Sequence, residues 1–219
     1  MSRHLEHELE DLKKLIFSLG TQVEENVELA LKSFEENLPS LVDQVFKNDS
    51  DIDQLEVKVE ETCLKILALH QPVAVDLRFI IAVLKMTNDL ERISSLASGI
   101  AKNSILFNKN KNNKNPLHLN PMSGMVTKIV HKCINSLMNM DVEIAREVVQ
   151  DDQNIDEMKK ELKQSILNEL QSDSSHAESL VALLTACNRL ERIGDHAQNI
   201  AEDVIYLIDA EIIRHQDKG

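Results

Sequence analysis

Apolar residues recur every three or four positions along most of the chain, with polar residues between them. The first stretch shows this pattern clearly, at Leu5, Leu9, Leu12, Ile16, Leu19, Val23, Val27, Leu31 and Phe34. Steps of three and four bring such side chains onto one face of an α-helix. The sequence therefore predicts a long amphipathic helix over residues 5–38.

The same periodicity predicts five further helices, separated by a few helix-breaking residues. Pro39 suits the first turn of the second helix, which runs to a break at His70-Gln71-Pro72. Further helices are predicted at about 73–106, 121–138, 141–170 and 176–213, with N-capping residues at 172–175. We therefore expect an all-α protein built from two tandem, pseudo-symmetric three-helix bundles.

Two segments are echoed at a distance that suits a whole domain. Residues 88–93, Asn-Asp-Leu-Glu-Arg-Ile, return 100 positions later at 188–193 as Asn-Arg-Leu-Glu-Arg-Ile. Upstream, the Asp49 and Asp53 pair returns 103 positions later as Asp152 and Asp156. This spacing is too long for a small solenoid repeat, so it indicates two similar halves packed together.

The amino-acid composition favours helices over sheet, and one stretch of biased composition marks the boundary between the two halves. The chain has five Gly, four Pro, no Trp and one Tyr, which disfavours extensive sheet. An Asn- and Lys-rich stretch has the character of a solvated linker. We predict a first repeat at 1–107, the linker at 108–117 and a second repeat at 118–219.

Charge and cysteine usage restrict the classes of partner and the location. With 24 basic and 37 acidic residues, the net charge of −13 repels nucleic acid and anionic lipid, so neither is expected as a partner. Cys63, Cys133 and Cys187 are isolated and odd in number, as expected of reduced core thiols. No apolar leader and no long apolar run is evident, so we expect a cytoplasmic protein without membrane insertion.

Paired carboxylates in the second half predict a cation site. Glu191 and Asp195 are four residues apart on one helix, and Asp152 and Asp156 are four apart on the preceding helix. If the helices bring the pairs together, two like charges at about 4 Å repel by about 4 kcal/mol at an effective dielectric of about 20. Protons or a cation must then offset this repulsion. Oxygen ligands favour hard ions such as magnesium, manganese or iron.

The first half repeats this arrangement with one departure. Asp49, Asp53 and Glu91 are present, but Ser95 occupies the position equivalent to Asp195. We therefore expect unequal half-sites, with tighter metal binding in the second half. A single acidic pair is usually only a solvated helix face, and the echo of both pairs argues against that interpretation. His196 adjoins the stripe, where a lone histidine is more typical of packing than of a ligand.

The motifs are spread over most of the chain and resemble those of the PhoU family, cytosolic regulators of bacterial phosphate uptake. They include Gln-Pro-Val-Ala-Val-Asp-Leu-Arg at 71–78 and Leu-Glu-Arg-Ile-Gly-Asp-His-Ala-Gln-Asn-Ile at 190–200. The resemblance implies tandem three-helix bundles, a homodimer and metal clusters on Glu/Asp-x-x-x-Asp motifs. The matching pairs are Asp49 with Asp53, Asp152 with Asp156, and Glu191 with Asp195. Glu91 lacks its terminal Asp. The implied metals are iron, manganese or magnesium, and zinc is also compatible.

The resemblance also implies partners and a function. The partners are the phosphate ABC transporter, through its ATPase subunit, and a sensor histidine kinase. The preferred hypothesis is a non-enzymatic negative regulator that couples these two. A carboxylate-bridged metal oxidase is an alternative, but such enzymes use Glu-x-x-His, and no Glu in this chain precedes a His by three residues. A metal-free scaffold with acidic stripes is the other alternative.

Overall fold

The computed structural model describes residues 3–36, 38–107 and 117–209. These residues form six long α-helices and one 3-10 turn, so the predicted all-α fold is confirmed. The helices are α1 (Arg3–Glu35), α2 (Pro39–His70), α3 (Ala74–Phe107), α4 (Asn120–Asn139), α5 (Val142–Ser172) and α6 (Ala177–Asp209). The 3-10 turn η1 (Ser174–His176) precedes α6. Each predicted helix is present, and its described ends differ from the prediction by a few residues.

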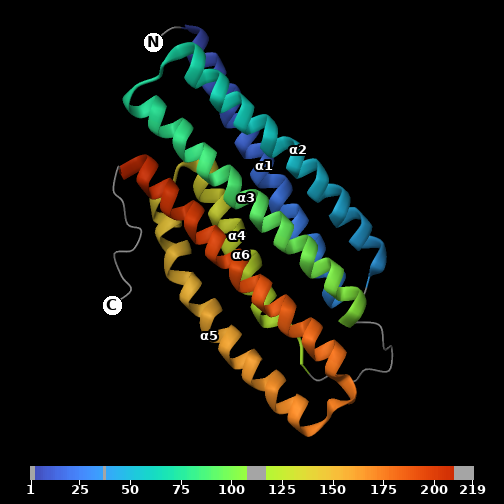
Figure 1. Cartoon of the computed structure of the whole chain (residues 1–219). Coiled ribbons are helices and arrows are strands. Elements are labelled where there is room, and N and C mark those ends of the chain that lie inside the picture. Colours follow the sequence, from blue (N-terminus) through green and yellow to red (C-terminus); the bar gives the residue numbers. More distant parts are fainter. Residues whose placement is uncertain (1–2, 37, 108–116, 210–219) are drawn as a thin grey trace.

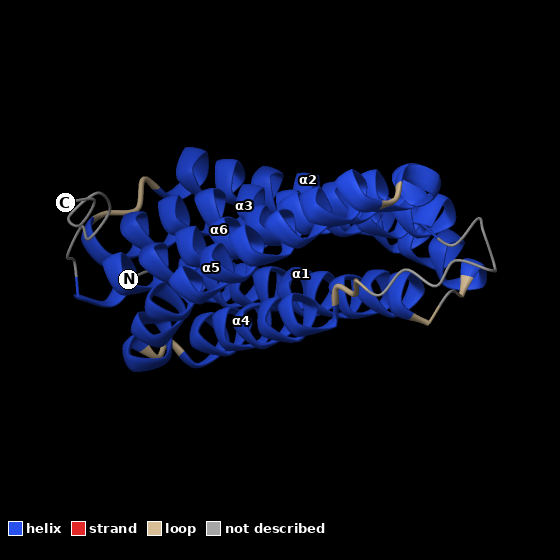
Figure 2. Ribbon diagram, turned by 90° about the horizontal axis from the view of Figure 1, so that it is seen from below, coloured by secondary structure: helices blue, strands red, loops and turns tan. Residues whose placement is uncertain are grey.

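The six helices form two layers (Figures 1 and 2). One layer contains four helices in the order α2, α3, α6 and α5, and the second contains α1 and α4. Helix α1 packs against α2 and α3, while α4 packs against α5 and α6. The first three helices and the last three are therefore two three-helix bundles, and α3 lies against α6 where the bundles meet.

The helix ends follow from local chemistry. Pro39 lies in the first turn of α2, where a missing backbone N–H costs little. Gln71, after the end of α2, adopts a left-handed conformation with φ 47°. Asp141 caps α5 by accepting hydrogen bonds from the backbone N–H groups of Glu143 at 2.9 Å and Ile144 at 3.1 Å. These residues fix where the antiparallel neighbours turn.

The two bundles share one hydrophobic core. The buried apolar residues of all six helices belong to a single contiguous cluster, and the contact between α3 and α6 is the most extensive between any two helices. Leu90 and Ile93 on α3 and Leu190 and Ile193 on α6 are all fully buried. The two bundles therefore do not merely touch at their surfaces. Their repeated apolar residues pack together in a common core.

Some sequence predictions lie where the structure is not described. Most of the predicted linker, at 108–116, and the predicted end of the last helix, at 210–213, lie outside the described residues. Within the described residues, no helix is long and apolar enough to cross a membrane. Cys63, Cys133 and Cys187 are all buried and unpaired with one another, in agreement with their predicted role as core thiols.

Gly99→Ala tests how closely α3 and α6 approach. A Cβ at Gly99 would lie 2.5 Å from Nε of Arg189, whose Nη1 donates to the Gly99 carbonyl at 3.0 Å. Alanine improves helix propensity by about 1 kcal/mol, but losing a charged hydrogen bond costs about 1.5–3 kcal/mol. We expect a net loss of about 1 kcal/mol in the free energy of unfolding, measured by urea denaturation.

Gly124→Ala is the matched control for this substitution. Gly124 also lies within a helix, and a Cβ there would meet no atom within 4 Å. This variant should gain up to about 1 kcal/mol in stability. If Gly99→Ala is stabilised as much as Gly124→Ala, then the Arg189 side chain can move away from the new Cβ without loss of stability.

Candidate metal centres

Four carboxylates of the first half gather between α2 and α3. We call Asp49, Asp53, Glu56 and Glu91 the first acidic cluster. Burial raises the pKa of Glu91, and the charges of Asp53 and Asp49 raise it further, against the opposing effect of Arg92. Burial also raises the pKa of Asp53, with a second contribution from Asp49. The structure thus brings together the three carboxylates predicted in this half.

Asp49 is anchored by a chain of two hydrogen bonds that crosses three helices. Ser94 Oγ on α3 donates to Asp49 Oδ1 at 2.5 Å, and Asn26 Nδ2 on α1 donates to Ser94 Oγ at 3.0 Å. Asn26 and Ser94 are fully buried, and Asn26 Oδ1 has no hydrogen-bond partner. Buried polar chains of this kind restrict side-chain orientation, so one Asp49 oxygen is held in place.

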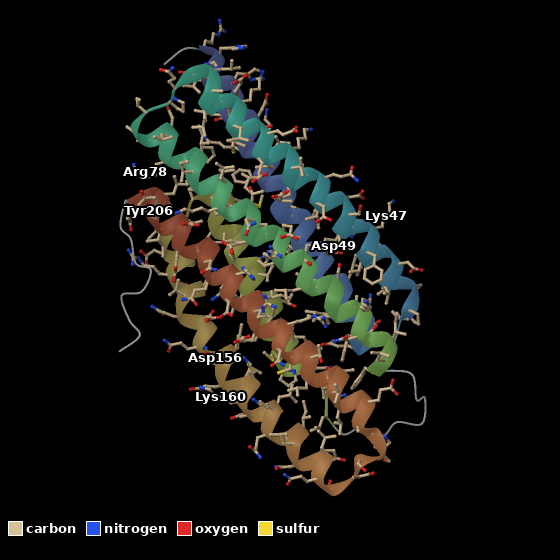
Figure 3. All side chains as sticks on the ribbon, in the orientation of Figure 1. Lys47, Asp49, Arg78, Asp156, Lys160 and Tyr206 are labelled. Atoms are coloured by element: carbon tan, nitrogen blue, oxygen red, sulfur yellow. The ribbon has the colours of Figure 1, made fainter. Side chains whose placement is uncertain are left out.

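The second acidic cluster consists of Asp152, Asp156, Glu191 and Asp195, from α5 and α6. Burial raises the pKa of Asp152 to about 6, and the charges of Asp195, Asp156 and Glu191 contribute further. Burial, then Glu191 and Asp156, also raises the pKa of Asp195. All four predicted carboxylates of this half therefore act on one another. Figure 3 shows Asp49 on α2 and Asp156 on α5, the outer helices of the four-helix layer.

Gly194 allows α5 to lie close to α6 at this cluster. A Cβ at Gly194 would lie 2.8 Å from both Asp152 Oδ1 and Ile155 Cδ1. The equivalent residue in the first half is Ser94, whose hydroxyl donates to Asp49. The same repeat position therefore holds an aspartate by a hydrogen bond in one half and makes room for an aspartate in the other.

A lysine lies within the second cluster. Lys159 Nζ donates to Glu191 Oε1 at 2.6 Å, and the two side chains are 26% and 20% exposed. Burial alone would lower the pKa of Lys159, but the hydrogen bond to Glu191 and the charges of Glu191 and Asp156 raise it overall. The second cluster is therefore partly neutralised by an ammonium group of the protein itself.

His196 lies between the two clusters, at the contact of α3 with α6. Its Nδ1 is 2.8 Å from Asp89 Oδ1, and Asn199 Nδ2 lies 3.5 Å from the same oxygen. His196 also acts electrostatically on Glu91 of the first cluster and Asp195 of the second. It is a packing residue with a carboxylate partner from the other half.

Two members of these clusters were not predicted from the sequence. Glu56 belongs to the first cluster, since burial and then the charges of Glu60, Glu91 and Asp53 raise its pKa. Lys159 belongs to the second. The signal was available, because the 103-residue offset that links Asp53 to Asp156 also links Glu56 to Lys159. Among the described residues, no three His, Cys, Asp or Glu side chains already form a metal site. Metal binding therefore stays a prediction.

Comparison with known proteins shows the family of this chain. The PhoU domain matches residues 16–104 and again residues 119–204. The chain belongs to the PhoU family. The phosphate-specific transport system accessory protein PhoU homolog of Pseudomonas aeruginosa is 33% identical over 216 residues, which cover 98% of this chain and 89% of that protein.

Solved PhoU structures share the fold. The crystal structure of PhoU from Pseudomonas aeruginosa superposes with a TM-score of 0.90 at 32% identity, covering 94% of this chain and 99% of that one. The phosphate transport system regulatory protein PhoU from Streptococcus pneumoniae gives 0.85 at 25% identity, covering 95% and 99%. These relatives are described as accessory and regulatory proteins, in line with the expectation of a non-enzymatic PhoU protein.

In this PhoU protein, the raised pKa of Asp152 makes stability depend on pH. Below about pH 4 the carboxyl group is protonated in both the folded and the unfolded state. There its favourable contribution to the free energy of unfolding is fully present. That contribution is lost as pH rises through about 6, because the folded state must then carry the charge. We therefore compare the free energies of unfolding of Asp152→Asn and wild type in the presence of a chelator. The difference should shift in favour of the variant by about 1–2 kcal/mol as pH rises from 4 to 7.5.

Urea denaturation at pH 4, 6 and 7.5 measures this difference. Glu157→Gln is the control, since Glu157 is an exposed carboxylate on the same helix. Equal pH dependence of Asp152→Asn and Glu157→Gln would contradict the burial of charge at Asp152.

Proposed function

We propose that this protein is a non-enzymatic cytoplasmic regulator that restrains phosphate uptake and phosphate-starvation signalling when phosphate is plentiful. Nearly full-length similarity to a phosphate-specific transport system accessory protein carries this proposal. The net charge of −13 supports action through protein contact, because it opposes binding to nucleic acid.

The proposed partners are the ATPase subunit of the phosphate ABC transporter and a sensor histidine kinase, with the protein acting as a homodimer of two-repeat chains. The resemblance of the motifs supports these partners. The surface also supports protein contact, since Leu69, Val73 and Val75 are 64%, 73% and 62% exposed around the turn between α2 and α3. Exposed apolar side chains gathered at one turn are typical of interaction surfaces.

We further propose that the acidic clusters bind hard metal ions, with iron, manganese and magnesium as candidates and zinc as a less suited one. The donors are all carboxylate oxygens, which these hard ions prefer. Asp53 and Asp49 raise the pKa of Glu91, and Asp195, Asp156 and Glu191 raise the pKa of Asp152, so a cation in either cluster would relieve repulsion. In the second cluster, the ammonium group of Lys159 forms an ion pair with Glu191, which shows that this position favours a positive charge.

Two other functions are kept as alternatives. An oxidase on a helical bundle would need histidine ligands in the Glu-x-x-His pattern, which the chain lacks. A metal-free scaffold would use the acidic clusters to bind basic partner surfaces, and the exposed position of Asp156 favours that use.

Deletion of the gene should raise phosphate uptake and starvation signalling in phosphate-rich medium, because a restraint has been removed. Radiolabelled phosphate uptake and a starvation-responsive reporter measure both effects. Removing the transporter in addition should abolish the response, since coupling requires it. The protein should also co-purify with the transporter, to different extents in high and low phosphate. Normal phosphate control in a clean deletion without a compensating paralogue would refute the assignment.

Metal analysis separates the three functions. The purified protein should contain a hard metal ion and should not consume oxygen when ferrous iron is added. Asp53→Asn combined with Glu91→Gln should lower the metal content, whereas Asp51→Asn, an exposed position on the same helix, should not. Oxygen uptake would favour the oxidase. Failure to bind any metal, with normal phosphate control retained, would favour the scaffold.

A further inference from the structure

The two acidic clusters differ in the charge of one equivalent residue. Asp49 and Asp53 correspond to Asp152 and Asp156 at an offset of 103, and the same offset takes Glu56 to Lys159. Both residues lie one turn beyond the aspartate pair on their helices. Glu56 interacts electrostatically with Glu91 of the adjoining helix, and Lys159 donates a hydrogen bond to Glu191. A carboxylate in one half is thus replaced by an ammonium in the other, which is a difference of two charge units.

Lys159 is well placed to compete with a metal ion. It comes from α5, reaches Glu191 on α6 at 2.6 Å and is only 26% exposed. A charge-assisted bond of this length between partly buried groups is among the stronger hydrogen bonds in proteins. A metal ion that binds Glu191 through Oε1 must displace this ammonium group, and one that binds through Oε2 is repelled by its charge.

The first cluster has a cation nearby, but its geometry is different. Arg92 Nε lies 3.5 Å from Glu91 Oε2, and the arginine side chain is 57% exposed. Arg92 adjoins Glu91 on the same helix and does not cross between helices. Exposed pairs of this kind contribute little and are screened by salt. Arg92 is therefore a much weaker competitor for a metal ion than Lys159.

We propose that Lys159 is a tethered cation that weakens metal binding at the second cluster, so that the first cluster is the tighter of the two sites. This inference rests on the proposed metal binding. It reverses the order predicted from the sequence, where the four motif carboxylates of the second half were set against three in the first. With Glu56 included, the first cluster also has four carboxylates, and it has no inserted ammonium among the described residues. Displacing the lysine should weaken binding about ten- to a hundredfold.

Reciprocal substitutions test the proposal with manganese(II) as the probe. Lys159→Met removes the charge but keeps the length of the side chain, and Lys159→Glu introduces the first-half residue. Glu56→Lys makes the opposite exchange. Lys160→Met is the control, because Lys160 is a neighbouring exposed lysine on the same helix. Calorimetric titration of metal-free protein gives the number and affinity of sites, and circular dichroism before metal addition checks the fold of each variant.

Wild type should show one tight and one weak class of manganese site. Lys159→Met and Lys159→Glu should tighten the weak class at least tenfold, Glu56→Lys should weaken the tight class, and Lys160→Met should change neither. Two equal classes in wild type, unchanged in Lys159→Met, would overturn the proposal while leaving metal binding intact. Absence of manganese, magnesium and ferrous iron binding in wild type and in every variant would instead remove the proposed metal function.

A measurement on the wild-type chain covers the case of a misfolded variant. Manganese(II) broadens the nuclear magnetic resonance signals of nearby amides. At one equivalent or less, signals around Asp53 and Glu91 should disappear before those around Asp156 and Glu191. Earlier loss around Asp156, or simultaneous loss at both clusters, would overturn the proposal without any substitution.

Discussion

The contact between α3 and α6 is the constraint on which the rest of the structure depends. The two helices run antiparallel, so Asp89 meets His196 while Gly99 meets Arg189. Asp89 and Arg189 occupy the same position of the repeat, yet one side chain accepts a hydrogen bond and the other donates. The halves are therefore complementary at their contact and not merely copies. Because one core runs through both, separating the bundles would expose apolar surface on each.

On either side of this contact lies a group of like charges, one on α2 and α3 and the other on α5 and α6. In the first cluster, Asp49 is held by hydrogen bonds that run from Asn26 through Ser94, and in the second cluster Lys159 offsets part of the repulsion. Solubility alone would not require such an arrangement, because fully exposed carboxylates repel only weakly in water. The repeat preserves the carboxylates but changes how each half offsets their repulsion.

The helices were predictable from the sequence because their apolar spacing is regular and their breaks carry Pro39, Pro72 and the Asp173 cap. The carboxylate pairs were predictable because the echo marks them. The role of Ser94 was not, since its hydrogen bond to Asn26 depends on how α1 lies against α3. Lys159 was overlooked for a different reason. A lysine three residues after Asp156 on a polar helix resembles surface charge, and only the packing against α6 turns it toward Glu191.

The position of the clusters suggests how the proposed metal binding would affect a proposed partner. Both clusters lie within the four-helix layer, and His196 acts electrostatically on a carboxylate of each. A divalent ion in the first cluster would remove about two negative charges from the α2–α3 side and leave the α5–α6 side, with Lys159, nearly unchanged. A partner that contacts α2 and α3 would then meet a different field from one that contacts α5 and α6. If metal binding at the first cluster raises the affinity for a partner by some factor, thermodynamic linkage requires that partner to raise the affinity for the metal by the same factor.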